Sequence, residues 1–214
     1  MANGELKMGN DLTLFSETED IKKKPLTIER LIEYWHSSFI IEGYDSRDEA
    51  DLARKRGEGL MGKYFEWWSL EEREVLVVES GFKLEVGEVK KGAEGAKGAK
   101  VPIIVSGRFD RVEKTSEGIR VIDYKTSKAR TQDVVDSDLQ LSIYALAVEE
   151  MFGEPCSELV LMFLREEEEK VIEVKTTRSK SQLEDAVSQI QKINKNIKNK
   201  NFSPTPSVEK CGCC

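Results

Sequence analysis

The alternation of apolar and polar positions predicts helices before, within and after a set of strands. Four stretches carry apolar residues at the spacing of a helix face, and they cover 28–39, 46–68, 138–151 and 181–197. Five runs rich in β-branched residues predict strands over 75–86, 101–112, 119–126, 159–164 and 171–174. Thr27 and a capping box at Ser46 begin the first two helices, and Asp136 or Ser137 caps the third. The order α-α-β-β-β-α-β-β-α favours the α/β or α+β class, with a central mixed sheet of about five strands flanked by helices.

The same pattern divides the chain into an arm, a domain and a tail. Residues 1–24 are polar and are expected to form a flexible arm. Residues 25–200 are expected to form a single domain, in which the Gly/Ala/Lys/Glu run at 90–100 is a flexible hairpin tip. Residues 201–214 form a tail that carries a cysteine cluster, and we interpret it as cut from a longer chain.

Composition places the chain among globular proteins without a membrane span. Its 214 residues are 34% charged and 39% apolar, and no run of eighteen apolar residues occurs. The amino terminus lacks the apolar stretch of a signal peptide, so a cytoplasmic, nucleoid-associated location is expected. The net charge of −7 argues against coating nucleic acid by bulk charge, but it leaves room for a local DNA-binding groove.

Two carboxylates and a lysine share the hairpin formed by the second and third predicted strands. If its tight turn centres on Ser116 and Glu117, Asp110 lies directly opposite Asp123, with Cβ atoms about 5 Å apart. Lys125 lies two residues after Asp123, on the same face. Because opposed like charges destabilise a sheet, we expect a hard divalent cation such as magnesium or manganese to offset them. The alternative interpretation is a solvated hairpin face on which Lys125 pairs with one aspartate.

Three motifs in this order carry a resemblance to a known family. They are GRFDRV at 107–112, DYKT at 123–126 and QLSIYA at 140–145. The set resembles the RecB-like branch of the PD-(D/E)XK nuclease superfamily, most of all the C-terminal nuclease domains of UvrD/Rep-type helicases. The likeness extends more weakly from Leu26 onward. It implies a restriction-endonuclease-like core and a DNA nuclease that hydrolyses phosphodiester bonds within a helicase–nuclease or DNA-repair protein.

The resemblance also implies roles for individual residues. The ligands of Mg²⁺ or Mn²⁺ would be Asp110, Asp123 and, through its backbone carbonyl, Tyr124. Lys125 would position or polarise the attacking water. Gln140 and Tyr144 lie four residues apart on one helix face and would help to hold the active site or the DNA. Without the resemblance, Tyr144 would be read as a core residue and Gln140 as an exposed one.

The predicted set of ligands departs from the family pattern at one position. Many RecB-like nucleases place a histidine ligand on the helix before the first strand, and 56–66 contains none. The sole histidine, His36, is expected to be structural or exposed, which leaves Glu58 as the candidate substitute. Glu79 matches a further acid often found on the preceding strand. The missing histidine favours a second interpretation, a catalytically weak or inactive nuclease-like module that binds DNA or scaffolds a helicase.

Basic residues near the hairpin predict contacts with DNA, either single-stranded or at duplex ends. The expected phosphate-binding residues are Arg108, Arg111, Lys128 and Arg130. Four more lysines in 192–200 could serve the same purpose, although lysines on a helix surface are more often only solvated. The resemblance also implies a helicase domain in the same parent polypeptide as partner. The CGCC ending at 211–214 resembles the prenylated tails of small GTPases, but these proteins need a P-loop and the chain has none. For the same reason no helicase motor is expected in these residues.

The cysteines suggest a severed metal-cluster site. Cys211 and Cys214 follow a Phe-Ser-Pro-Thr-Pro segment in a way that resembles the start of the C-terminal iron–sulfur ligand set of several RecB-like nucleases. The early cysteine of that set is absent and the next would lie beyond residue 214, so a cluster is expected only in a longer parent chain. Clustered thiols without an export signal argue against a disulfide framework.

Overall fold

The computed structural model describes residues 25–90, 100–204 and 206–207. By its internal contacts the chain divides into two compact units, residues 1–66 and 67–214. The single domain expected over 25–200 thus contains parts of two such units. The expected arm at 1–24, most of the expected hairpin tip and the cysteines of the tail lie outside the described residues.

Two helices make up the described part of the first unit. They are α1 (Ile28–Ser38) and α2 (Arg47–Trp68), whose last two residues belong to the second unit. The indole Nε1 of Trp35 donates to the carbonyl of Arg54 at 2.8 Å, which joins the two helices. A Cβ atom at Gly57 would come within 2.1 Å of the Trp35 ring. Glycine therefore allows the two helices to approach closely here.

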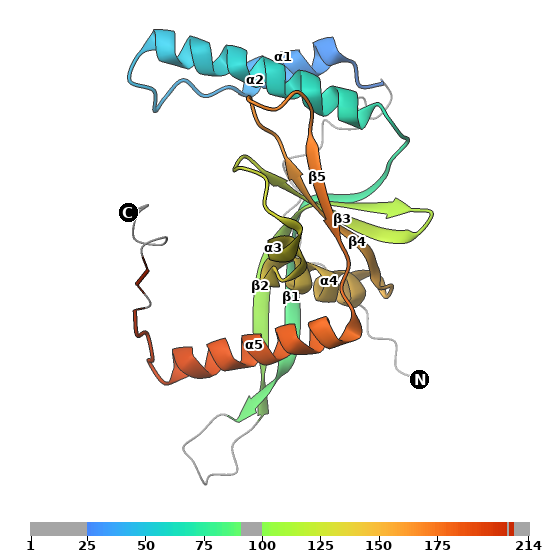
Figure 1. Cartoon of the computed structure of the whole chain (residues 1–214), viewed down its shortest axis with the longest axis vertical. Helices are drawn as coiled ribbons and strands as arrows, with labels where there is room; N and C mark the ends of the chain where they lie inside the picture. The colour runs from blue at the N-terminus through green and yellow to red at the C-terminus, as the bar shows by residue number, and fades with distance from the viewer. Residues whose placement is uncertain (1–24, 91–99, 205, 208–214) are drawn as a thin grey trace. The chain divides into compact units, whose positions relative to one another are not determined.

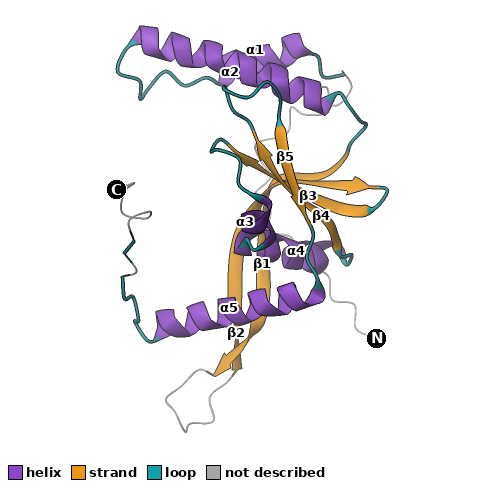
Figure 2. Cartoon of the chain, in the orientation of Figure 1, coloured by secondary structure: helices purple, strands orange, loops and turns teal. Residues whose placement is uncertain are grey.

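Five strands in the second unit form one mixed sheet (Figures 1 and 2). The strands are β1 (Glu74–Lys90), β2 (Lys100–Thr115), β3 (Gly118–Lys125), β4 (Cys156–Phe163) and β5 (Ile172–Thr176). They lie in sequence order across the sheet, with β3 and β4 parallel and every other neighbouring pair antiparallel. This arrangement confirms the predicted class and sheet.

Three helices accompany the sheet. They are α3 (Gln132–Asp136), α4 (Leu139–Phe152) and α5 (Lys180–Lys198). The α3 helix was not predicted from the sequence, because five residues are too few to show a helical period. Its presence also moves the cap of α4 from the predicted Asp136 or Ser137 to Asp138, whose side chain accepts from the backbone N–H of Gln140.

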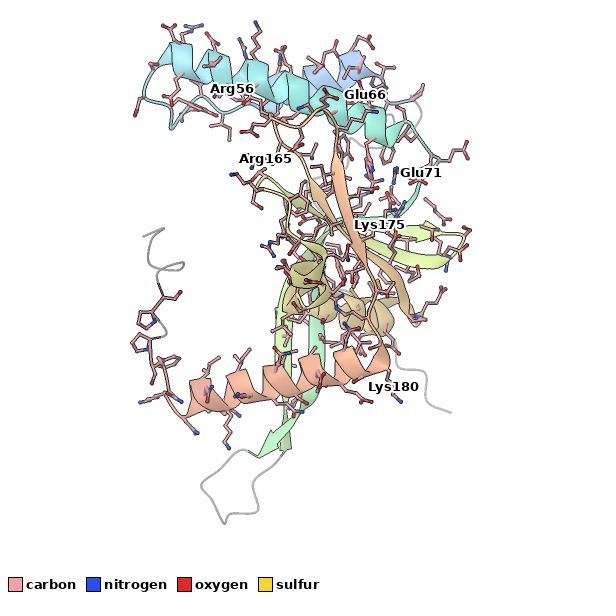
Figure 3. The ribbon with its side chains drawn as sticks, viewed as in Figure 1. Arg56, Glu66, Glu71, Arg165, Lys175 and Lys180 are labelled. Carbon is pink, nitrogen blue, oxygen red and sulfur yellow. The ribbon has the colours of Figure 1, made fainter. Side chains whose placement is uncertain are left out.

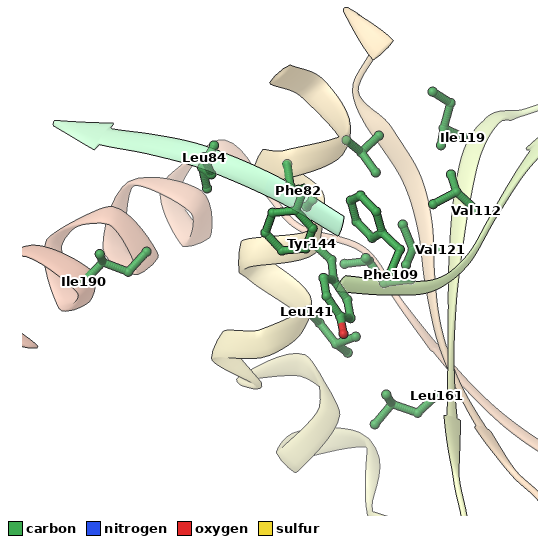
Figure 4. Close-up of a cluster of buried hydrophobic side chains, with 14 of the residues drawn as sticks. Phe82, Leu84, Phe109, Val112, Ile119, Val121, Leu141, Tyr144, Leu161 and Ile190 are labelled. Carbon is green, nitrogen blue, oxygen red and sulfur yellow. The ribbon is translucent and has the colours of Figure 1, made fainter. Parts of the chain in front are cut away.

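One hydrophobic core joins α4 and α5 to the same face of the sheet (Figure 4). The strands contribute side chains such as Phe82, Phe109 and Val121, and the helices contribute Leu141 and Ile190. The middle of α4 is apolar, and Leu141, Tyr144, Ala145 and Val148 are buried there, whereas Gln140 and residues 149–151 are exposed. The amino-terminal end of α4 thereby lies beside the carboxyl end of β3, where Gln140 contacts Asp123 and Lys125.

Candidate active site

The hairpin formed by β2 and β3 has the register that the sequence predicts. Its last pair is Thr115 with Gly118, so the turn centres on the two residues between them. The ladder ends at the pair Arg111 and Ile122. Continued by one step, the same register would place Asp110 opposite Asp123.

The backbone of β1 and β2 is bent beside Asp110. Phe109 and Val112 pack in the same core, although strict alternation would place them on opposite faces of the sheet. On β1 the residue level with Asp110 is Glu79, because its neighbours pair with Phe109 and Arg111. Glu79 has a φ of 48°, which lies in the left-handed region that non-glycine residues rarely adopt. The bend therefore occurs in both strands at the level of Asp110, where β2 leaves β3.

The separation of β2 from β3 gives the Asp110 carboxylate a backbone partner. Its Oδ2 accepts the N–H of Tyr124 at 2.8 Å. Beyond Ile122, the residues of β3 pair with β4 alone, and Asp123 lies level with Leu161. The side chain of Asp110 thus occupies the place where the β2 backbone would otherwise continue the ladder.

Asp123 is the buried centre of the site, with only 2% of its surface exposed. Its Oδ2 lies 2.5 Å from Nζ of Lys125, and its Oδ1 accepts from the hydroxyl of Tyr144 at 3.1 Å. Burial raises the pKa of Asp123 and the charge of Asp110 adds to this effect, whereas Lys125 and the Tyr144 hydroxyl act in the opposite direction. The net pKa is raised, so a further positive charge beside Asp123 would stabilise its ionised form.

Gln140 and Tyr144 reach this centre from α4. The Gln140 amide accepts from Lys125 Nζ at 3.4 Å and donates to Asp123 Oδ1 at 3.3 Å and to the Tyr144 hydroxyl at 2.9 Å. Tyr144 is 5% exposed and its ring packs against Phe82 and Phe109 in the core. Burial, followed by the charge of Asp123, raises the pKa of Tyr144, so its hydroxyl stays protonated and able to donate. Tyr144 is therefore both a core residue and a partner of the buried carboxylate.

The other predicted acids, Glu79 and Glu58, have partners of their own. Glu79 and Arg108 are exposed and pair with each other at 3.8 Å, while the Arg108 carbonyl accepts from Tyr144. Glu58 belongs to the first unit, where its carboxylate lies 2.7 Å from Nε2 of His36. The expectation that His36 is structural or exposed agrees with this surface pair.

The prediction that Arg111 contacts DNA needs correction. Arg111 is only 4% exposed, and its Nε donates to Glu113 at 2.6 Å. Its guanidinium also lies over the ring of Trp68, 4.3 Å from the ring centroid. A guanidinium buried between a carboxylate and an indole is not available to a phosphate. Alternation explains the placement, because Arg111 and Asp110 are consecutive and point to different faces.

The remaining residues that were predicted to contact phosphate differ in their exposure and in their ion pairs. Lys128 is exposed in the loop after β3. Arg130 pairs with the carboxylate of Asp138 at 2.8 Å, so a DNA contact would have to compete with this pair. Arg165, which no sequence motif marks, is labelled in Figure 3. It donates to the carbonyl of Thr126 at 3.3 Å, just beyond Lys125 in the chain. The parallel pairing of β3 with β4 brings it there, because both strands end at the same edge of the sheet.

The donor atoms of this site suit a hard divalent cation. Among the described residues, no group of three or more histidine, cysteine, aspartate or glutamate side chains is arranged to hold a metal ion. Asp110 and Asp123 nevertheless offer carboxylate oxygens from neighbouring strands, and water and phosphate oxygens commonly complete the coordination of magnesium. The residues present therefore fit a cation held by two carboxylates.

The cysteines do not contribute a site within the described residues. The Cys156 thiol donates to the carbonyl of Glu158, and burial raises its pKa to about 12. A thiol with this pKa stays protonated at neutral pH and is a poor metal ligand. Cys211 and Cys214 lie outside the described residues, so the iron–sulfur remnant stays a prediction.

The fold and the motifs together define a nuclease-type domain, and comparison with known families agrees. The family model of the PD-(D/E)XK nuclease superfamily matches residues 12–214, so the chain belongs to this superfamily. Its members generally use divalent metal ions. None of the curated proteins matches the chain.

Two solved structures are similar over most of the chain at low sequence identity. The crystal structure of SSO0001 is 12% identical, covers 85% of this chain and 90% of its own, and has a TM-score of 0.38. A protein of Eubacterium rectale, named provisionally as an exonuclease, is 13% identical, covers 87% of this chain and 73% of its own, and has a TM-score of 0.37. Within the described parts of the chain, no helix has the length and apolar character needed to cross a membrane.

Proposed function

We propose that the chain is a metal-dependent DNA nuclease domain of the RecB-like branch that hydrolyses phosphodiester bonds. One observation carries the proposal: Asp123, Lys125, Gln140 and Tyr144 form one hydrogen-bonded group beside Asp110. Counted with Asp110, these residues come from three separate motifs. A solvated hairpin face would give no reason for α4 to direct two polar side chains at a buried carboxylate. Perturbed carboxylates with defined partners are typical of functional sites.

In this proposal Asp110 and Asp123 hold Mg²⁺ or Mn²⁺, together with the backbone carbonyl of Tyr124. The bound cation would polarise the scissile phosphate and lower the pKa of a nearby water. The buried carboxylate of Asp123 supports this role, because burial disfavours its charge in the absence of a cation. Asp110 is tethered by the Tyr124 N–H through Oδ2, which orients its carboxylate.

Lys125 is the proposed positioning group for the attacking water and for charge that develops on the phosphate. Its ammonium lies 2.5 Å from Asp123 and 3.4 Å from Gln140, so two partners orient it. Tyr144 orients Asp123 from the side of the core through its hydroxyl. Donors held in place before the substrate arrives stabilise developing charge without reorganisation during the reaction.

The wider context of the proposal comes from the motif resemblance. DNA, single-stranded or at duplex ends, is the proposed substrate, and Arg108 and Lys128 are the exposed basic residues nearest in sequence to the proposed ligands. A helicase domain in the same parent polypeptide, with a role in repair or recombination, is part of this proposal.

A second candidate function is a nuclease-like module that binds DNA without cutting it. The chain lacks the histidine of many relatives, and the described residues provide no three-ligand metal group. Lys125 also pairs directly with Asp123, which would stabilise the site without a cation. A cleavage assay separates the two functions.

The test measures cleavage of end-labelled single-stranded and duplex DNA in Mn²⁺ or Mg²⁺. Asp123→Asn and Lys125→Met are compared with the control Asp133→Asn, which changes an exposed aspartate on α3. We expect cleavage by the wild type and the control, and a loss of about 100-fold or more in both site variants. If the wild type and all variants bind DNA and none cleaves it, the non-cutting module is the correct function.

A further inference from the structure

Arg178 lies in the segment that joins β5 to α5, and the sequence motifs do not mark it. Its guanidinium is half-buried, and each of its five N–H groups has an acceptor. The acceptors are the Ser142 hydroxyl at 2.8 Å, the Thr176 hydroxyl and Thr177 carbonyl at 2.9 Å each, the Val135 carbonyl at 2.9 Å and the Asp138 carbonyl at 3.0 Å. A guanidinium with every donor used has one allowed position and orientation.

The acceptors of Arg178 surround the junction between α3 and α4. Val135 lies near the end of α3, Asp138 is the N-cap of α4, and Ser142 lies in the first turn of α4. All five acceptors are neutral carbonyl or hydroxyl oxygens. Burial lowers the pKa of Arg178, and the charges of Asp136 and Asp138 oppose this effect. The guanidinium therefore holds these segments together through directed hydrogen bonds and not through a direct ion pair.

The junction held by Arg178 determines where Gln140 lies. The Asp138 carboxylate caps α4 by accepting the N–H of Gln140 at 2.8 Å. From this first turn the Gln140 side chain reaches both Asp123 and Lys125. A shift of the first turn of α4 would therefore move the Gln140 amide away from the two groups that it bridges.

We propose that Arg178 is a positioning residue that acts through Gln140 on the proposed active site. This inference rests on the proposed nuclease function. Lysine cannot replace arginine in this role, because a single ammonium has three donors and lacks the planar fork that reaches β5, α3 and α4 at once. Arg178→Lys should therefore fold but leave the first turn of α4 less well held.

The first test compares cleavage kinetics of Arg178→Lys and Arg178→Met with those of Arg54→Met. Arg54 is the matched control, because its guanidinium pairs with Asp51 in the first unit and has no part in the proposed site. We expect kcat to fall roughly 10- to 100-fold in both Arg178 variants with KM for DNA little changed, since misplacing a supporting group by about 1 Å can have such an effect. The control should keep wild-type kcat.

A double-mutant cycle distinguishes positioning from a general loss of stability. If Arg178 acts through Gln140, then Arg178→Lys reduces kcat little further once Gln140→Ala is present. If the double variant loses kcat by the product of the two single-variant losses, the inference is overturned. Circular dichroism on each variant confirms that folded proteins are compared, and Arg178→Lys serves if Arg178→Met does not fold.

A second readout does not depend on catalysis. The side-chain amide ¹H–¹⁵N resonances of Gln140, assigned by loss in Gln140→Ala, should shift in Arg178→Lys and stay in place in Arg54→Met. Unmoved resonances in Arg178→Lys would overturn the inference even if the wild type cleaves DNA. Shifted resonances in a protein that does not cleave would refute the proposed nuclease function while supporting the structural link from Arg178 to Gln140.

Discussion

Replacing Glu113 should show how strongly a buried charge network supports the strand that carries Asp110. Glu113 is fully buried on β2 and accepts hydrogen bonds from three arginines. The distances are 2.6 Å from Arg111 Nε, 2.6 and 3.0 Å from Arg120 Nη2 and Nε, and 3.4 Å from Arg73 Nη1. Arg120 lies opposite Glu113 in the hairpin and also pairs at 3.0 Å with Glu71.

The expected loss of stability follows from the burial of the charges around Glu113. Glu113→Gln keeps the shape of the side chain but removes the counter-charge of Arg111 and Arg120, which are 4% and 7% exposed. Burial by itself lowers the pKa of Arg120, and its bonds to Glu113 and Glu71 reverse this effect, so the guanidinium depends on these partners. Removing one partner of a buried ion pair typically costs about 3–5 kcal/mol. At roughly 2–4 °C per kcal/mol for a chain of this size, the unfolding midpoint should fall by about 10 °C.

A hydrophobic replacement of the network is expected to behave differently. In the triple variant Arg111→Met, Glu113→Leu, Arg120→Met no buried charge is left without a partner. Arg73 keeps its 2.8 Å pair with Glu71 in this variant. Well-packed apolar replacements of buried ion pairs are often neutral or stabilising by about 1–4 kcal/mol. Breaking the network should therefore destabilise the fold more than removing it.

Urea unfolding monitored by circular dichroism measures the free energy of unfolding of all three proteins. A lower midpoint at unchanged slope would show a loss of stability without a change in the denatured state. The reasoning is refuted if Glu113→Gln lies within about 1 kcal/mol of the wild type, which is the range of an exposed pair. It is equally refuted if the triple variant is no more stable than Glu113→Gln.

Two further predictions concern packing and pH. Gly107→Ala should destabilise the fold by about 1–3 kcal/mol, because the new Cβ would lie 2.4 Å from the Phe82 ring. Gly59→Ala, which adds a Cβ in open space on α2, should stabilise the fold by up to about 1 kcal/mol. Urea unfolding of the two variants measures both effects. The hydrogen bond from Thr176 is the largest effect that lowers the pKa of Asp136. The ionised Asp136 carboxylate should therefore contribute its full stabilisation at pH values above 3.8, the ordinary pKa of the group. This stabilisation should be lost as the pH falls through the lower pKa of Asp136 in the folded state. The stability difference between wild type and Asp136→Asn, followed by acid titration, should therefore shrink on acidification, and a constant difference would contradict the assignment.

Local patterns were enough to predict the strands, the long helices and the hairpin that carries the candidate site. The strands and the long helices show clear periods, and a two-residue turn at Ser116 and Glu117 determines which residues of β2 and β3 face each other. Continued one step beyond its last pair, Arg111 with Ile122, that register would bring Asp110 level with Asp123. The i, i+4 spacing likewise placed Gln140 and Tyr144 on one face of α4, and both reach Asp123.

Other features depended on contacts between elements that are distant in the sequence. The bend at Glu79 breaks the alternation that a strand pattern assumes, so periodicity could not show that Phe109 and Val112 share a core. Arg111 looked like a phosphate ligand because its charge is visible in the sequence, whereas its burial against Glu113 is not.

The sequence by itself determined the strands, the long helices, the hairpin register and the identity of the superfamily motifs, because each is encoded by residues close together in the chain. Only the tertiary structure decided which charges are buried and which face the candidate site. Arg178 illustrates the reason, since its five acceptors come from β5, the segment after it, α3 and α4. Such an arrangement exists only after these elements have packed together, and no period or spacing along the chain records it.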